Sequence, residues 1–173
     1  MIKLIGVEIK INHFPDGTQL LKYDWEIVKY SNTITWRYDK EEELSTLIFL
    51  TLDVKDKNSK AIVNLFLDYV PNARMDRVHK NDVFTLKWFA EVINWLGFDN
   101  VYALDVHSNV SLGLIDRIRT CNLDRIIHTI LNNIRENVDS IDDLIIYFPD
   151  DGAMKRYIEL FNQFKMCYGS QVS

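Results

Sequence analysis

Several residue types that mark particular classes of protein are scarce in this sequence. Among its 173 residues there are two cysteines, three prolines and six glycines. Cys121 and Cys167 lie far apart and match no spacing of a metal site, so we expect buried or idle thiols. The sequence also has no internal repeat, no low-complexity segment and no stretch typical of a linker. A chain of this length without a linker predicts a single domain over residues 1–173.

Long apolar runs and an excess of positive charge are missing as well. No stretch approaches the roughly 20 apolar residues that a membrane-spanning helix needs, and the start Met1-Ile2-Lys3 does not predict a signal peptide. The net charge of -5 argues against nonspecific binding of nucleic acid, which requires a basic surface. These absences predict a soluble cytoplasmic protein without nucleic-acid or membrane partners. Such a protein can bind phosphates only through local basic groups.

The first third of the sequence has the apolar periodicity of strands. Residues 4–11 alternate between apolar and polar side chains, which predicts a half-buried strand. The segment Phe14-Pro15-Asp16-Gly17 predicts a turn, because Pro fixes one backbone φ and Gly permits a positive one. Further strands are predicted over residues 20–28 and 33–38. The chain therefore opens with a strand-rich meander.

The remainder alternates strands with helices. An acidic turn at residues 40–43 opens a helix that reaches residue 52, and a polar loop is predicted over residues 55–60. The elements that follow are a strand at 61–68, a helix at 83–96, a strand at 100–104, a helix at about 122–137, a strand at 143–148 and a helix at about 152–166. This order predicts an α/β fold with a mostly parallel sheet flanked by helices. We expect the tryptophans to pack in the core: Trp25, Trp36, Trp88 and Trp95.

Polar, chargeable groups follow three of the apolar runs. They come after residue 67, after residue 104 and after residue 148. In an open α/β sheet, ligands bind outside the carboxyl ends of the strands, so we expect the three groups to converge in space.

The first of these groups contains Arg74, Asp76 and Arg77, followed by His79 and Lys80. Guanidinium groups form bidentate hydrogen bonds to phosphate oxygens, so this segment is interpreted as a mobile loop that binds a polyphosphate. The alternative is a solvated loop with a local Arg–Asp pair.

The second group consists of Asp105, His107 and Ser108, and Asp116 lies downstream of it. A carboxylate and an imidazole two residues apart can both face one pocket and hold a divalent cation or its water shell. Mg²⁺ prefers oxygen ligands and keeps waters while it bridges substrate phosphates. The alternative is that His107 caps a turn.

The third group, Asp150, Asp151 and Gly152, precedes a predicted helix. Asp is a favoured N-cap residue, which is the structural interpretation. The functional one is that a helix N-terminus binds anions, with Lys155 and Arg156 adding positive charge in its first turn. The segment of Phe14 and Asp16 also has two interpretations. It is either a plain β-turn or a turn whose aromatic ring and carboxylate contact a nucleobase.

Taken in order, four motifs resemble the phosphoribosyl pyrophosphate synthetase (ribose-phosphate diphosphokinase) family. The family pattern has a Phe-x-Asp-Gly-Glu turn, a Pro-Tyr-x-x-Tyr-Ala-Arg-Gln-Asp-Arg loop, an Asp-x-His strand end and a Pro-Asp-x-Gly-Gly-x-Lys-Arg turn. The corresponding segments here are residues 14–18, 69–77, 105–107 and 149–156. The resemblance spans almost the whole chain and implies the N-terminal domain of such an enzyme, with a phosphoribosyltransferase-like fold.

The resemblance also implies an activity. The enzyme transfers the β,γ-diphosphoryl group of ATP to the 1-hydroxyl of ribose 5-phosphate, requires Mg²⁺ and assembles as a homo-oligomer, a dimer or a hexamer. Phe14 and Asp16 then contact the adenine from a neighbouring subunit, and His107 contacts Mg²⁺–ATP. Arg74, Asp76 and Arg77 lie in the loop over the triphosphate. The implied metal ligands are Asp105, His107, Asp150 and Asp116, and the implied phosphate-binding residues are Lys155 and Arg156.

Four features depart from the family pattern. Thr18 replaces the Glu of the first turn, and Met75 replaces the Gln of the loop. Neither the catalytic Lys-x-Arg flap nor the ribose-5-phosphate domain has a match, so no catalytic residue is assigned. The sequence predicts the ATP- and Mg²⁺-binding half of the enzyme, inactive alone. The alternatives are a non-catalytic regulatory or structural subunit, or an unrelated nucleotide-binding domain.

Overall fold

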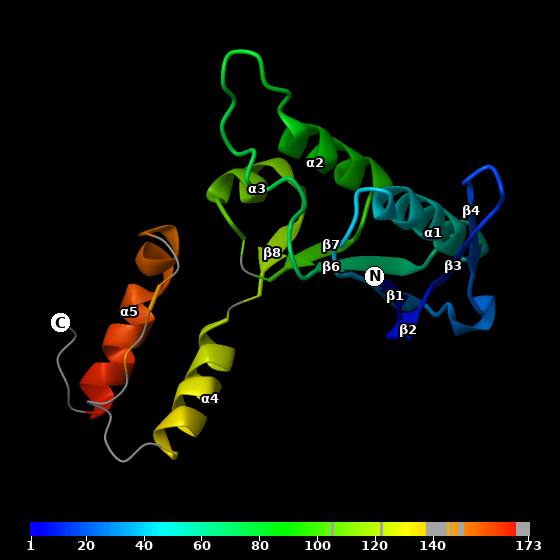
Figure 1. Cartoon of the computed structure of the whole chain (residues 1–173). Helices are drawn as coiled ribbons and strands as arrows, with labels where there is room; N and C mark the ends of the chain where they lie inside the picture. Colours follow the sequence, from blue (N-terminus) through cyan, green and yellow to red (C-terminus); the bar gives the residue numbers. More distant parts are fainter. Residues whose placement is uncertain (105, 122, 138–144, 146, 149–150, 169–173) are drawn as a thin grey trace. The chain divides into compact units, whose positions relative to one another are not determined.

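A computed structural model gives the fold of the chain (Figure 1). It describes residues 1–104, 106–121, 123–137, 145, 147–148 and 151–168; in the last helix, side chains are described up to residue 163, apart from that of residue 156. The chain divides into two compact units, Met1–Cys121 and Asn122–Ser173. Among the described residues, no helix combines the length and apolar character that a membrane crossing requires.

The first unit contains a six-stranded sheet in the order β2-β1-β5-β6-β7-β8. The strands are β1 (Ile2–Leu4), β2 (Val7–Glu8), β5 (Ser31–Trp36), β6 (Ile62–Leu67), β7 (Asn100–Ala103) and β8 (Ile118–Thr120). The four strands from β5 to β8 pair in parallel, whereas β1 and β2 pair antiparallel. The predicted mostly parallel α/β sheet with an antiparallel N-terminal part is therefore confirmed.

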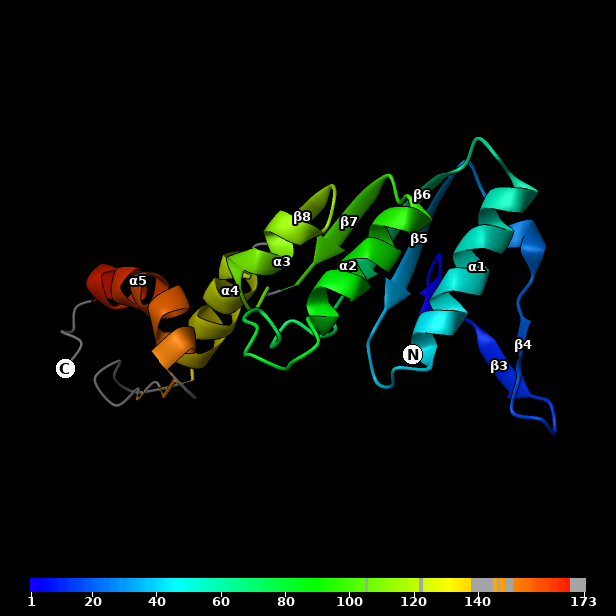
Figure 2. The same ribbon diagram turned by 90° about the horizontal axis from the view of Figure 1, so that it is seen from above.

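Three helices connect the parallel strands and lie on one face of the sheet (Figure 2). They are α1 (Glu43–Lys57), α2 (Thr85–Leu96) and α3 (Asn109–Leu114). Alternate residues of β5 and β6 are buried, among them Ile34, Trp36 and Leu65, which are fully enclosed. Because side chains alternate between the two faces of a strand, this period of two concentrates the core on one side of the sheet.

The strand predicted over residues 4–11 is wrong, because the chain turns back at Ile5 and Gly6. Both residues have positive φ, 49° and 81°, and Leu4 pairs directly with Val7 across the turn. Two residues with positive φ are the signature of a tight hairpin loop whose twist matches the strands. The β-branched Ile5 is unusual in this conformation, so no residue pattern marks a turn here.

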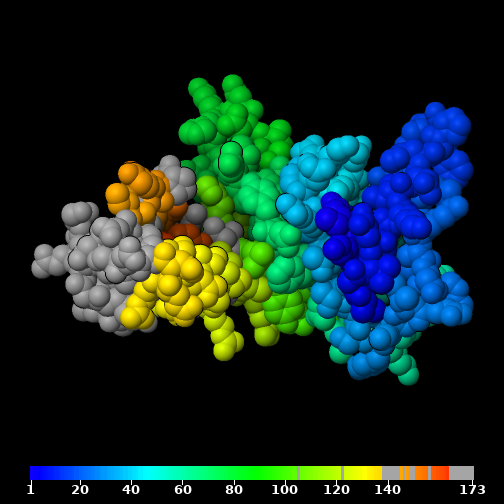
Figure 3. Space-filling view, turned by 60° about the horizontal axis from the view of Figure 1, so that its bottom comes forward, coloured from blue at the N-terminus to red at the C-terminus, as the bar shows by residue number. Residues whose placement is uncertain are grey.

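A second hairpin follows, made by β3 (Lys10–His13) and β4 (Gln19–Lys22). Its tip is the predicted turn, which closes with a 2.9 Å hydrogen bond from the Gly17 amide to the Phe14 carbonyl. The strand predicted over residues 20–28 ends early, because Asp24 caps a short 3-10 helix, η1 (Trp25–Ile27), by accepting from the Glu26 amide at 3.0 Å. In the space-filling view this hairpin stands out at one end of the first unit (Figure 3).

The predicted burial of four tryptophans holds for Trp36 only. Trp25, Trp88 and Trp95 expose 60%, 57% and 65% of their surface. In α2 the buried face is instead formed by Leu86, Phe89, Ala90, Ile93 and Leu96. This helix is apolar on two sides, so helical periodicity alone could not tell which side packs inward. Its predicted end is confirmed by Gly97, which takes the left-handed conformation with φ 64°.

Two further boundaries differ from the prediction. The polar loop expected over residues 55–60 begins later, because α1 continues to Lys57. The short elements α3 and β8 were not predicted, and together they complete one more parallel crossover. The second unit contains α4 (Asp124–Arg135) and α5 (Asp151–Tyr168), as expected, and the ring of Phe148 contacts that of Phe161 edge-on at 5.3 Å. The strand predicted over residues 143–148 falls mainly outside the described residues.

Candidate functional site

Two polar loops leave the sheet side by side at its carboxyl edge. Strands β6 and β7 are in register there, with Leu67 opposite Ala103, and the Leu104 amide donates to the Leu67 carbonyl at 2.9 Å. The loop over residues 68–84 begins after β6, and the loop over residues 104–108 begins after β7. Because the two strands are parallel and adjacent, their following loops meet at one edge, as predicted for the first two of the three polar groups.

The first loop is anchored at its base and exposed beyond it. Val70 and Ala73 are buried in the core, and the Ala73 amide donates to the Val70 carbonyl at 3.2 Å. Between them Asn72 has a φ of 61°, a left-handed conformation that Asn tolerates better than most residues. Arg74 and Arg77 follow with exposed side chains. The buried base thus anchors the segment that carries the two arginines, and their guanidinium groups are accessible to solvent.

The side chains between these arginines differ in environment. Asp76 is half-buried, whereas Met75 is half-buried and packs against the hydrophobic core. The Met75 amide donates to the Asn72 carbonyl at 2.9 Å, which closes a turn at this point. Met75 therefore holds the loop by apolar contact and offers no polar group to a ligand.

The second loop carries an exposed His107 and leads into α3. Ser108 is the N-terminal flanking residue of this helix and has extended backbone geometry, with φ -149° and ψ 159°. Asp105, predicted to act with His107, lies outside the described residues. Arg74, Arg77 and His107 thus share one edge of the sheet through the topology of β6 and β7.

Asp116, a predicted metal ligand, is not brought to this edge. It lies two residues before the start of β8, and its amide donates to the side-chain oxygen of Asn94 at 2.8 Å. Since β8 runs parallel to β7, a residue before β8 lies at the opposite edge, where the strands begin. The topology separates Asp116 from His107 and argues against a shared metal site.

The turn at the tip of the β3–β4 hairpin exposes Phe14 and Asp16. One oxygen of Asp16 accepts hydrogen bonds from the Thr18 amide at 2.9 Å and from the Thr18 hydroxyl at 2.7 Å. These bonds favour the charged carboxylate and lower the pKa of Asp16. In both ribbon views the β3–β4 hairpin and strand β8 lie at opposite ends of the first unit (Figures 1 and 2).

The third predicted group belongs to the second unit. Asp150 lies outside the described residues, and α5 begins at Asp151. Lys155 is exposed near the start of that helix, while the side chain of Arg156 is not described.

A metal ion held by the protein alone requires several ligand-type side chains close together. In the described part of the chain no three His, Cys, Asp or Glu side chains come together in a way that could hold a metal ion. Mg²⁺ often binds through one or two carboxylates, its own waters and substrate phosphates, so such a cluster is not required for it.

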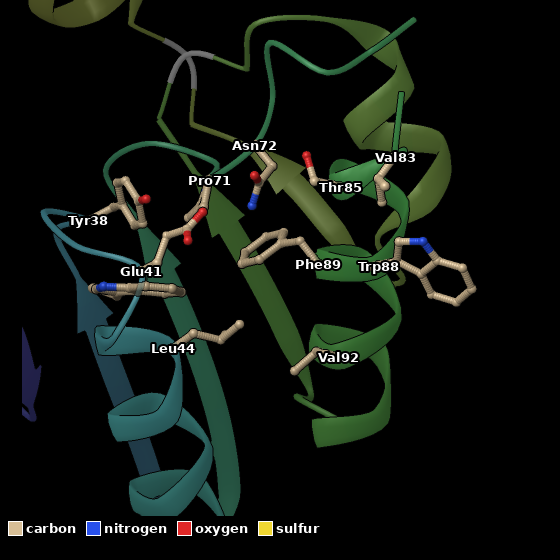
Figure 4. A pocket seen from close by; sticks show the side chains of 11 residues that line it. Tyr38, Glu41, Leu44, Pro71, Asn72, Val83, Thr85, Trp88, Phe89 and Val92 are labelled. Carbon is tan, nitrogen blue, oxygen red and sulfur yellow. The ribbon is translucent and has the colours of Figure 1, made fainter. Parts of the chain in front are cut away.

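The sequence prediction missed a pocket beside this edge, with a volume of about 460 Å³. Its apolar side is formed by Trp36, Leu44, Phe89 and Val92, and its polar groups come from Tyr38, Glu41, Asn72 and Thr85. It lies between the start of α1 and the start of α2, where β5 and β6 end (Figure 4). We call it the β5–α2 pocket. One signal was available in the sequence: residues 37–41 are a further polar group that follows a strand.

A solved structure of similar shape indicates the fold class of this chain. No known protein-family profile matches the chain. A solved phosphoribosylpyrophosphate synthetase from Mycobacterium smegmatis superposes with a TM-score of 0.70 at 16% identity, covering 95% of this chain and 55% of that one. The fold is thus the phosphoribosyltransferase type of α/β fold.

Curated relatives narrow the class further. The ribose-phosphate pyrophosphokinase of Methanobrevibacter smithii is 30% identical over 147 residues, which are 84% of this chain and 48% of that protein. The corresponding protein of Listeria ivanovii is 25% identical over 175 residues, or 94% of this chain and 52% of that protein. The chain belongs to the phosphoribosyl pyrophosphate synthetase family, which confirms the resemblance seen in its motifs. It spans about half the length of the curated relatives it matches.

Proposed function

We propose that this chain is the ATP- and Mg²⁺-binding half of a ribose-phosphate diphosphokinase. The whole enzyme transfers the β,γ-diphosphoryl group of ATP to the 1-hydroxyl of ribose 5-phosphate. The observation that carries the proposal is the exposed pair Arg74 and Arg77, on a loop anchored next to the loop of His107. This chemistry depends mainly on positioning and on neutralising phosphoryl charge, which two guanidinium groups can supply.

The roles of the other residues follow from this assignment. Arg74 and Arg77 bind the triphosphate by bidentate hydrogen bonds, and His107 donates to a phosphate oxygen from the neighbouring loop. Asp105 and Asp150 are the candidate residues that would hold Mg²⁺, which would supply positive charge against the phosphates when bound with the nucleotide. No step is assigned to the metal, because the described residues form no metal-binding cluster of their own. Lys155 and Arg156 are further candidates for phosphate contacts.

The hairpin residues belong to a different part of the proposal. Phe14 and Asp16 lie at an exposed tip that stands away from the body of the first unit (Figure 3). Such a position favours a contact to the nucleobase bound by a second copy, and so a homo-oligomer. The exposed aromatic ring supplies a stacking surface and the carboxylate accepts hydrogen bonds.

A second candidate function is a non-catalytic subunit of such a synthetase. The observation that favours it is Met75, which packs against the core where the family motif has a Gln. A loop that has lost this polar group keeps its shape and loses one contact to the ligand. In this case the chain contributes to assembly or regulation.

Titration of the chain with Mg²⁺–ATP, followed by calorimetry and by the melting temperature, tests the proposal. Binding of Mg²⁺–ATP raises the melting temperature by mass action. Arg74→Ala and Arg77→Ala each weaken this binding about tenfold, because hydrogen bonds to charged groups are lost. Lys60→Ala is the matched control, since this exposed residue precedes β6 at the opposite edge of the sheet. Absence of binding at millimolar ATP supports the non-catalytic subunit instead. Equal loss in all three variants refutes the assigned loop.

A further inference from the structure

The β5–α2 pocket is built from three separate segments of the first unit. Tyr38 and Glu41 come from the turn between β5 and α1, Asn72 from the loop after β6, and Thr85 and Phe89 from α2. Its volume of about 460 Å³ falls in the range of roughly 300 to 1,000 Å³ that small-molecule sites occupy. The proposed triphosphate site does not use these residues.

The pocket separates apolar from polar groups. Figure 4 shows the side chains of Glu41 and Asn72 pointing toward one another above the ring of Phe89, with Leu44 and Val92 farther down. A few convergent polar groups over a mostly apolar lining are the usual composition of a ligand site. A ligand that matches this pattern has a flat apolar body and a polar head.

The charge of the lining selects among such ligands. Glu41 is the one charged residue among those that line the pocket, and Lys, Arg and His are missing from that lining. The half-buried Tyr38 senses this charge: burial raises the pKa of its hydroxyl, and the carboxylate of Glu41 raises it further. A negative lining repels phosphate and favours groups that donate hydrogen bonds or carry positive charge.

Two further observations distinguish the pocket from a simple packing defect. Val83 and Trp88, which also line it, expose 64% and 57% of their surface, so large apolar groups remain in water at its mouth. Asn72 holds its amide in the pocket from a backbone with a φ of 61°. Exposed apolar groups and strained backbone both concentrate at binding sites.

We propose that the β5–α2 pocket binds a small aromatic ligand that carries N–H donors and no phosphate. The ring lies on the apolar side against Leu44 and Val92, which are half-buried, and its N–H groups donate to the carboxylate of Glu41. The side-chain amide of Asn72 supplies a donor and an acceptor for the edge of the ring. Two sources share this chemistry, a neutral nucleobase and a protonated aromatic amine. The inference goes beyond the proposed ATP site and does not depend on it.

Two probes distinguish the sources, guanosine for the nucleobase and tryptamine for the amine. Each is titrated into the full chain by calorimetry and by saturation-transfer NMR, with guanosine 5′-monophosphate as the anionic comparison. We expect at least one probe to bind at millimolar concentration or below and the monophosphate to bind more weakly than guanosine. Binding of guanosine alone identifies a nucleobase site, and binding of tryptamine alone identifies an amine site.

Three variants test the location. Glu41→Gln weakens the binding of the probe about tenfold, because a charged acceptor is lost. Asn72→Gly removes the side-chain amide, and Gly tolerates the positive φ at this position. Glu42→Gln is the matched control, since this neighbouring carboxylate is exposed, pairs weakly with Lys40 at 3.7 Å and does not line the pocket. Val92→Trp fills the pocket and abolishes binding, and its circular dichroism reports whether it folds.

The outcomes separate this inference from the proposed function. Arg74→Ala weakens the binding of Mg²⁺–ATP and leaves the binding of the probe unchanged. Glu41→Gln weakens the binding of the probe and leaves that of Mg²⁺–ATP unchanged. The inference is overturned if neither probe binds at millimolar concentration, or if Glu41→Gln and Glu42→Gln have the same effect. It is also overturned if, in the Arg74→Ala variant, the monophosphate binds more tightly than guanosine.

Discussion

The ammonium group of Lys55, on α1, lies 2.6 Å from the carbonyl oxygen of Gly97 at the end of α2. It also donates to the Leu96 carbonyl at 2.7 Å. The last carbonyl groups of a helix lack intrahelical partners and carry partial negative charge, so a cation from a neighbouring helix satisfies them well. This contact joins two of the helices that cover the sheet and fixes where α2 ends.

Replacing Lys55 by Met keeps the apolar part of the side chain and removes these two hydrogen bonds. We expect a loss of about 1–2 kcal/mol in the free energy of unfolding, measured by urea titration of tryptophan fluorescence. The control is Lys57→Met on the same helix, whose 3.7 Å ion pair with Asp53 is largely exposed, so about 0.5 kcal/mol or less is expected. Equal losses in the two variants contradict the role assigned to Lys55.

Glu43 holds the start of α1 through a buried carboxylate. One oxygen accepts from the Trp36 indole N–H at 2.9 Å and from the Asp39 amide at 2.9 Å, and the other accepts from the amino group of Met1. Burial raises the pKa of Glu43, but these three hydrogen bonds outweigh it, and the net pKa is lowered. The folded state therefore favours the charged carboxylate.

The lowered pKa of Glu43 has a defined effect on stability. Its contribution is fully present above the unfolded pKa, near 4.3, and is lost as the pH falls through the lower folded value. Glu43→Gln costs about 1–3 kcal/mol at neutral pH and flattens the decline in acid, measured by urea unfolding at a series of pH values. Glu42→Gln is the exposed control, and we expect it to keep the steep decline. A steep acid decline that survives in Glu43→Gln contradicts this assignment.

Three of the parallel strands, β5, β6 and β7, were predictable because each has at least four residues with a recognisable apolar pattern, and helical patterns separate them along the chain. The elements that were missed are those in which local patterns are short or ambiguous. Strand β8 has three residues, too few to show a period, and the turn at Ile5 places a β-branched residue where Gly or Asn is usual. The exposed Trp88 shows that apolar character on two sides of a helix does not tell which side is buried.

The part of the candidate site that follows the parallel strands was also predictable. Arg74 and His107 follow neighbouring parallel strands, so the topology dictates that they share an edge. The β5–α2 pocket was missed because it depends on how separate segments pack. Glu41 and Asn72 lie 31 positions apart, and each has an ordinary local explanation, as an acidic residue at a helix start and as a turn residue. Contacts between distant segments are a product of the tertiary fold and leave no local pattern.

Tyr23 attaches the β3–β4 hairpin to α1 by donating a hydrogen bond to the carboxylate of Asp53. Burial raises the pKa of Tyr23 well above its usual value, and the hydrogen bond and the charge of Asp53 raise it further. The folded state therefore holds this proton more tightly than the unfolded state does. The resulting stability is fully present below about pH 10, the ordinary pKa of Tyr, and is lost as the pH rises above it.

Tyr23→Phe removes the hydroxyl and leaves the ring. We expect a loss of about 0.5–1.5 kcal/mol at neutral pH and a flatter decline of the unfolding free energy between pH 9 and pH 11. Tyr30→Phe is the control, because this side chain exposes 66% of its surface and should leave both quantities unchanged. If Tyr23→Phe declines in alkali as steeply as the unmodified chain, the bond to Asp53 is not the cause.

Thr18 sets the charge state of Asp16 at the hairpin tip. Its hydroxyl makes the larger contribution to the lowered pKa of Asp16, and its amide makes the next. Thr18→Val removes the hydroxyl and keeps the branched shape and the amide, so the pKa of Asp16 rises toward its ordinary value of about 3.9. NMR titration of the Asp16 carboxyl carbon measures this change directly.

Thr18→Ser is the matched comparison, because it retains the hydroxyl that donates at 2.7 Å and loses only a methyl group. We expect it to keep the pKa of Asp16 low. The proposed contact of Asp16 with a nucleobase requires an ionised carboxylate that stays an acceptor across the physiological range. Thr18→Val should leave Mg²⁺–ATP binding at neutral pH nearly unchanged, since Asp16 is still ionised there, and weaken it only as the pH approaches 4. If the pKa of Asp16 is the same in both variants, the Thr18 hydroxyl does not control it, and the short bond at the tip has no effect on charge.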